Sequence, residues 1–217
     1  QTEQKSLETR RDSGAAMVET HVKDSGRPDE ALARVTDPVV RQREMAAVLK
    51  RVAVNDLKDD ALKSPEVLAG MRVAFSGRVG DVVKKLNPDK QKVVMETLGT
   101  LDTSTAPAEA VEMRIQLTGK IDATTAVPSI TAAVKTMDQR QLGELNVATA
   151  TPGQMDAVLD GLADNMQTMR SAPANKDANP LTLKNIKIAI LASTDPRYQP
   201  LKDAINVPGK QNKWNAV

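Results

Sequence analysis

Apolar residues recur every three or four positions along most of the chain, which is the spacing of one face of an α-helix. The stripe is clearest over residues 40–52, 68–86, 155–169 and 183–191. No stretch gives a convincing strand signal. The pattern therefore predicts an all-α fold, an irregular multi-helix domain of about eight or nine helices arranged in one lobe or two.

A capping residue followed by proline marks the expected start of several of these helices. The side-chain oxygen at the N-cap accepts a hydrogen bond from an unpaired backbone N–H, and proline has no N–H to lose at the next position. The pairs are Asp37-Pro38, Ser64-Pro65, Asn87-Pro88, Thr151-Pro152, Asn179-Pro180 and Asp195-Pro196. In the Thr151 pair, Gln154 also stands where a capping box requires it.

Shorter helices are expected over residues 87–98, 107–117, 128–137 and 199–205, with Gly99 and Gly119 at C-terminal stops. Breaks are expected over residues 101–107 and 171–179, where Pro, Ser, Thr, Asn and Ala cluster. No period of 20 to 50 residues recurs, so the sequence does not predict a solenoid.

The first 35 residues are polar and carry too few apolar residues to define a buried face. Ser-Gly at residues 13–14 and Ser-Gly-Arg-Pro at residues 25–28 interrupt them. We interpret residues 1–35 as a polar connector from an upstream domain. Residues 36–217 are then the helical domain.

The composition supports helix-on-helix packing. The chain has 217 residues, of which 40% are apolar and only 1% aromatic. The core must come from Val, Leu, Ile, Ala and Met, whereas strands favour aromatic side chains. Lys and Arg number 30 against 28 Asp and Glu, no basic block stands out and base-stacking aromatics are scarce, which argues against nucleic-acid binding. No apolar run is long enough to span a membrane.

The inventory of reactive side chains is short. The chain has no cysteine and one histidine, His21. Disulfides, thiolate metal sites, a catalytic thiol and a thioester intermediate are excluded, and a histidine-cluster metal site or a Ser-His-Asp triad lacks its parts. We expect no metal, no cofactor and no covalent catalytic residue.

Three other features have both a structural and a functional interpretation. Methionines on the stripe of residues 155–169 suit core packing better than a binding groove. Arg78 and Arg114 could serve as arginine fingers in a GTPase regulator, but neither differs from an ordinary surface arginine. Trp214, near the end of the sequence, either pins the C-terminal segment to the body or acts as an exposed anchor.

The stretch Met137-Asp-Gln-Arg-Gln-Leu-Gly-Glu-Leu-Asn146 leaves a sharper choice. Leu142 and Leu145 are three residues apart, so a helix would place them on one side, as for core packing. Gly143 costs about 1 kcal/mol relative to alanine inside a helix, so the helix could instead end near Leu142 and present it to a partner. Both alternatives stay open on residue type alone.

The cysteine-free helical domain, the Gln141-Leu142-Gly143 segment and the final Lys-Trp-Asn-Ala-Val resemble the XL-box ubiquitin ligase domain. That family is represented by Xanthomonas outer protein L, a type III effector of plant pathogens, in which a leucine-rich-repeat domain precedes the ligase domain. The resemblance covers residues 36–217. Its most specific part is a three-residue segment.

The resemblance implies a ubiquitin ligase that is secreted into the host cytoplasm and needs neither cysteine nor zinc. Such a ligase recruits a charged host ubiquitin-conjugating enzyme and promotes direct transfer of ubiquitin to a lysine of a host protein. The family's enzyme-binding segment is His-Leu-Gly, whose last two residues match Leu142 and Gly143, whereas Gln141 departs from it. The expected conjugating-enzyme-binding residues are therefore Gln141, Leu142 and Gly143. The alternative is a non-catalytic helical module that binds a host protein or regulates a small GTPase.

Overall fold

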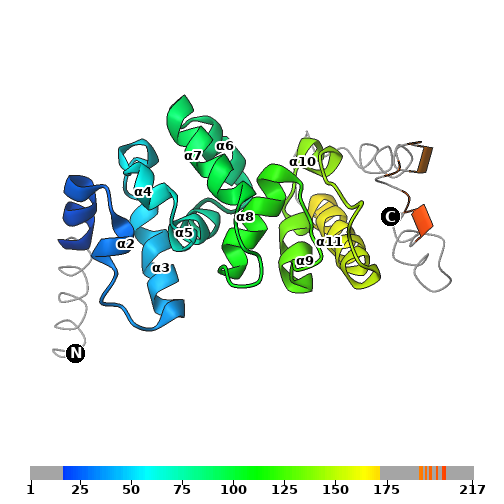
Figure 1. Cartoon of the computed structure of the whole chain (residues 1–217), viewed down its shortest axis with the longest axis horizontal. Coiled ribbons are helices and arrows are strands. Elements are labelled where there is room, and N and C mark those ends of the chain that lie inside the picture. The colour runs from blue at the N-terminus through cyan, green and yellow to red at the C-terminus, as the bar shows by residue number, and fades with distance from the viewer. Residues whose placement is uncertain are drawn as a thin grey trace. The chain divides into compact units, whose positions relative to one another are not determined.

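The computed structural model describes residues 17–171 and residues 191, 192, 194, 196, 199, 202 and 203; the side chains of residues 139, 152 and 166–171 are excepted. Helices account for the regular structure of this part of the chain (Figure 1). Its one β-feature is an isolated parallel bridge between Lys120 and Asn146. The all-α prediction is confirmed for the described residues.

The chain divides into two compact units, residues 1–101 and 102–217, which we describe separately. The boundary falls at the break expected over residues 101–107. In unit 1, residues 17–25 are helical. The further helices of unit 1 are α2 (Pro28–Ala31), α3 (Pro38–Leu49), η1 (Val54–Asp56), α4 (Asp59–Leu62), α5 (Pro65–Phe75), η2 (Ser76–Arg78), α6 (Val79–Lys84) and α7 (Pro88–Gly99).

The core of unit 1 is aliphatic and methionine-rich, as the composition requires. α3 and α5 contribute four of its large, fully buried side chains, Met45, Leu49, Leu68 and Met71. An ion pair of 3.2 Å between Arg41 and Glu66 joins the same two helices at the surface.

Two regions of unit 1 differ from the sequence interpretation. Residues 17–35 contain helical turns and bury Val22 and Leu32, which are 1% and 3% exposed, so this part of the expected connector packs as part of unit 1. The single stripe expected over residues 68–86 is divided at Ser76, whose φ of 43° is incompatible with a continuing helix. α5 ends there and α6 begins after the short η2.

Four helices make up the continuous described part of unit 2, residues 102–171. They are α8 (Ala108–Thr118), α9 (Val127–Lys135), α10 (Gln139–Gly143) and α11 (Pro152–Ser171). Figure 1 shows α9 and α11 side by side, with α10 near one end of the pair.

The three longer helices of unit 2 run in the same direction. Thr131, in the middle of α9, donates a hydrogen bond to the carbonyl of Ala157, in the first half of α11, and Lys135 at the end of α9 pairs with Asp164 further along α11. A Cβ on Gly161 would lie 2.8 Å from Cβ of Val134, so only glycine allows this close approach. Gln116, late in α8, likewise donates to the carbonyl of Ala133, late in α9.

The predicted helix starts are confirmed wherever the structure describes them. Asp37, Ser64 and Asn87 each accept a backbone N–H of the following turn. Thr151 and Gln154 form the predicted capping box, with the Thr151 N–H donating to Gln154 Oε1 at 2.8 Å. Asn179 and Pro180 lie outside the described residues, and so does Asp195 of the last pair.

Candidate functional site

α10 begins at a complete capping box formed by Asp138 and Gln141. The backbone N–H of Gln141 donates to Asp138 Oδ1 at 2.8 Å, and the backbone N–H of Asp138 donates to Gln141 Oε1, also at 2.8 Å. Gln141 is only 3% exposed. Its side-chain oxygen is therefore committed to the start of the helix rather than offered to a partner.

Leu142 and Leu145 pack into unit 2, with exposed fractions of 5% and 6%. A helix of five residues is too short to be stable alone, and burial of its apolar side holds it in place. The expectation that Gln141 and Leu142 present their side chains to a visiting protein is therefore wrong. The alternative of core packing, left open by the sequence, is the one that the structure adopts.

Gly143 is the one residue of the expected segment that faces solvent. No atom lies within 4 Å of the position that a Cβ would take, and its φ is not positive. Arg140 and Glu144 lie on either side of it, joined by an ion pair of 2.8 Å and each about half exposed. We call Arg140, Gly143 and Glu144 the α10 face.

The α10 face is held at the C-terminal end of α8 by Gly119. Gly119 has the left-handed φ of 66° and forms the C-cap of α8, and its carbonyl accepts the N–H of Asn146 at 2.7 Å. A Cβ on Gly119 would collide with the carbonyl oxygen of Glu144. This backbone-to-backbone approach fixes where the end of α10 lies.

Because Leu142 is buried, we expect Leu142→Ala to lower the free energy of unfolding by about 2 to 4 kcal/mol. Chemical denaturation followed by circular dichroism measures the change. A Leu142→Glu variant is expected to unfold unit 2 and so is unsuitable as a probe of docking. A change below about 0.5 kcal/mol for Leu142→Ala would contradict the packing of α10 described above.

A second polar cluster surrounds Asp122 in unit 2. Its carboxylate accepts hydrogen bonds from the hydroxyls of Thr103, Thr124 and Thr125 at 2.7 to 3.1 Å and from Arg114 Nη1 at 2.7 Å. Partial burial acts to raise the pKa of Asp122. The hydrogen bonds from Thr124, Arg114 and Thr125 outweigh it and hold this pKa well below its usual range.

Arg114 fits neither interpretation from the sequence, an arginine finger or an ordinary surface arginine. It is 6% exposed and ion-paired with Asp122, so it is not a surface arginine and is not available as an arginine finger. Arg78, in η2, is exposed. The candidate GTPase-regulator residues therefore reduce to Arg78.

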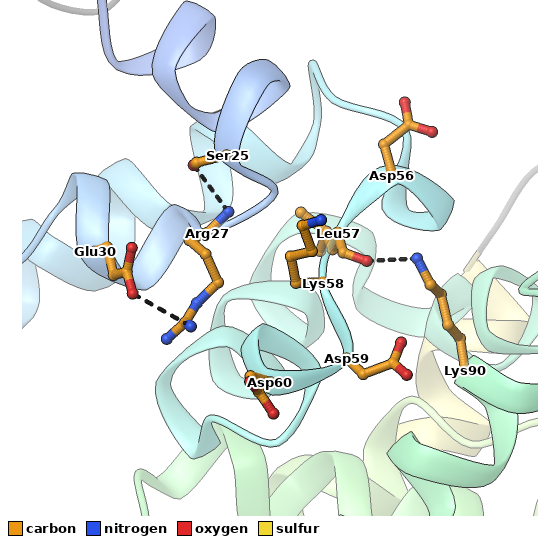
Figure 2. Close-up of a pocket in the computed structure, with 9 residues that line it drawn as sticks. All are labelled: Ser25, Arg27, Glu30, Asp56, Leu57, Lys58, Asp59, Asp60 and Lys90. Atoms are coloured by element: carbon orange, nitrogen blue, oxygen red, sulfur yellow. Dashed lines mark hydrogen bonds and ion pairs between the residues drawn. The ribbon is translucent and has the colours of Figure 1, made fainter.

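Unit 1 contains an open polar pocket of about 670 Å³ (Figure 2). Its lining comes from segments that are distant in sequence and is charged or polar except for one side chain. The lining residues are Ser25, Arg27, Glu30, Asp56, Leu57, Lys58, Asp59, Asp60 and Lys90. Small-molecule sites of this size are usually mostly apolar.

Two of the three cations in this pocket are already engaged. Arg27 forms a bidentate pair with Asp29, through contacts of 3.1 and 2.8 Å, and a further ion pair with Glu30. The ammonium of Lys90 donates to the backbone carbonyls of Asn55 and Leu57, the second of which is visible in Figure 2. The Arg27 contacts are local to the start of α2, whereas Lys90 joins α7 to the segment of η1. Both sets of contacts account for these charges structurally.

Further sequence expectations concern metals, membranes and Trp214. In the described ranges no group of three or more His, Asp or Glu side chains could hold a metal ion. No helix in that same part of the chain is long and apolar enough to cross a membrane. Met155, the described member of the methionine stripe of α11, is buried. Trp214 lies outside the described residues.

Comparison of the chain with protein-family models, with curated proteins and with solved structures finds no match.

Proposed function

We propose that the chain is a protein-binding module that presents the α10 face to a partner protein. In its narrower form, which rests on the resemblance, the partner is a host ubiquitin-conjugating enzyme charged with ubiquitin. The chain would then be a ubiquitin ligase that a plant-pathogenic bacterium secretes into the host cytoplasm, and its substrate would be a host protein.

The observation that carries the proposal is the glycine at the centre of the α10 face. Gly143 is the last residue of α10 and is exposed. At Gly143 neither backbone strain nor a neighbouring atom requires glycine. A glycine with open space around it leaves room for the close approach of another backbone.

The anchoring of α10 supports the same proposal. The capping box, the two buried leucines and the contact between Gly119 and Glu144 hold a short helix in one orientation. A docking element fixed before binding loses little conformational entropy when the partner arrives. In this proposal Gln141 and Leu142 act indirectly, because they position the face and do not touch the partner.

The chemistry of the narrower proposal suits a chain without cysteine. The lysine amine of the substrate attacks the thioester carbonyl of ubiquitin, and the thiolate of the conjugating enzyme leaves. The ligase supplies no nucleophile. Its contribution is to orient the two reactants, which can provide a large share of the barrier reduction.

Gly143→Glu is expected to abolish polyubiquitin formation, or to reduce it at least tenfold, in a reaction with activating enzyme, conjugating enzyme, ubiquitin and the full chain. The added side chain has open space within the fold but would obstruct a partner at the α10 face. The matched control is Gly99→Glu, which makes the same change at another open, exposed glycine at the end of a helix, α7 in unit 1. Product ladders and direct binding of the conjugating enzyme are measured for both variants.

The possible outcomes separate the two forms of the proposal. Equal activity of the two glutamate variants would remove the α10 face as the docking surface. No product from the unaltered chain with a broad panel of conjugating enzymes would remove the ligase function. In that case, capture of a host protein that Gly143→Glu prevents and Gly99→Glu permits would leave a non-catalytic binding module.

A further inference from the structure

Three loops share one local structure; the first begins at Leu101, the last residue of unit 1, and the other two lie in unit 2. In each loop, an apolar residue comes directly before an Asp or Asn, and a threonine comes three positions after that Asp or Asn. The loops are Leu101-Asp-Thr-Ser-Thr105, Ile121-Asp-Ala-Thr-Thr125 and Leu145-Asn-Val-Ala-Thr149. In all three the side-chain oxygen of Asp102, Asp122 or Asn146 accepts the backbone N–H two residues later, at 2.9, 3.1 and 3.1 Å.

Each loop is hydrogen-bonded to the next. The hydroxyl of Thr103 in the first loop donates to Asp122 in the second at 3.1 Å. The hydroxyl of Thr149 in the third donates to the carbonyl of Ile121 in the second at 3.0 Å. Gln154, after the third loop, donates to the carbonyls of Asp122 and Thr125. The three loops therefore lie in a row.

The same order holds for the helices that follow the loops. α8 follows the first loop, α9 the second and α11 the third, and the three helices run in the same direction with α9 packed between α8 and α11. Each loop thus recurs together with the helix that follows it, so the similarity among the three segments includes a helix as well as a turn.

We infer that the described part of unit 2 contains three copies of one loop–helix repeat, and that α10 is an insertion between the second and third copies. After α8, only Gly119 and Lys120 precede the next apolar–Asp pair. After α9, an apolar–Asp pair comes one position sooner, at Met137-Asp138, but Asp138 caps α10 and accepts the N–H three residues later instead of forming the loop. Residues 138–144 then precede the pair Leu145-Asn146. These seven residues contain α10 and the whole α10 face.

The α10 face therefore lies on a segment inserted between two copies of the repeat. In repeat proteins, insertions in single copies map to loops on one face, which is often the binding face. The repeat stands on the fold alone, whereas the role of the insertion in recognition rests on the proposed function. The sequence pattern does not reveal this repeat, because the copies are of unequal length and share only a few residues.

The equivalence of the loops is tested by converting the third loop toward the second. Asn146→Asp with Ala148→Thr restores the Asp and the hydroxyl of the second loop, and both sites are exposed. We expect hydrogen exchange at the Ala148 amide to stay the same or slow. Asn146→Leu, which removes the acceptor, is expected to quicken it roughly tenfold. Equal quickening in the double variant and in Asn146→Leu would overturn the repeat.

The insertion is tested by deleting residues 138–144 in the full chain, with Leu142→Ala as a control that removes the same buried side chain. We expect the deletion variant to keep the amide protection of Thr124 and Ala148 while its binding to a ubiquitin-conjugating enzyme falls at least tenfold. Loss of that protection in the deletion variant but not in Leu142→Ala would overturn the insertion. Retained protection with unchanged binding would instead overturn the proposed function and leave the repeat standing.

Discussion

Gly119→Ala is expected to destabilise unit 2 by about 2 to 5 kcal/mol and to displace α10. Two costs combine. Alanine in the left-handed region is less favourable by about 1 to 2 kcal/mol. The new methyl group would also meet the carbonyl oxygen of Glu144, and relief of such overpacking costs about 1 to 3 kcal/mol.

Denaturant unfolding measures the stability change, and hydrogen exchange at Asn146 locates it, because that amide donates to the Gly119 carbonyl. Gly99→Ala serves as the control, since no atom lies near its Cβ position, and it is expected to leave stability unchanged or to raise it by up to about 1 kcal/mol. If the two alanine variants were equally stable, the close approach between α8 and α10 could not hold α10 in place.

The same substitution bears on the proposed function. A shifted α10 carries Arg140, Gly143 and Glu144 with it, so Gly119→Ala should weaken binding of a partner although residue 119 lies outside the α10 face. A milder loss than that of Gly143→Glu is expected, because the face is moved and not obstructed. Binding equal to that of the unaltered chain would mean that the position of α10 does not matter to recognition.

The sequence predicts those features of the fold that depend on local chemistry. Asp37, Ser64, Asn87 and Thr151 can be identified as helix starts because a cap needs only its own side chain and the next turn of backbone. Gly119 is recognised as a stop for a similar reason. Its second role, the approach to Glu144, is a tertiary contact that no local pattern reveals.

The sequence interpretation fails where tertiary packing decides. The stripe that continues past Ser76 has the period of a single helix, yet the backbone turns there and α6 packs separately. The sequence does not decide whether Leu142 is buried, because a short polar stretch with two leucines suits an exposed turn as well as a short helix with a buried side. The role of Gln141 in the capping box was detectable, since Asp138 precedes it by three residues.

Asp122→Ala is expected to lower the stability of unit 2 by about 2 to 3 kcal/mol. The change removes four side-chain hydrogen bonds and leaves Arg114, which is 6% exposed, without its counter-ion. The Asp122 side chain itself is 41% exposed, so solvent screens part of its attraction and the estimate stays below that for a fully buried pair. Asp122→Asn keeps the shape of the side chain and removes the charge, and a smaller loss is expected.

The same carboxylate makes unit 2 sensitive to acid. The pKa of Asp122 is lower in the folded chain than the usual value of about 3.9, so its contribution is complete above about pH 4. It is lost as the pH falls below that value toward the lowered pKa, because the unfolded chain takes up the proton first. Unfolding free energies measured from pH 6 down to pH 2 should therefore fall less steeply for Asp122→Asn than for the unaltered chain. Parallel pH profiles would show that the ion pair with Arg114 and the threonine hydrogen bonds do not stabilise the charged form of Asp122.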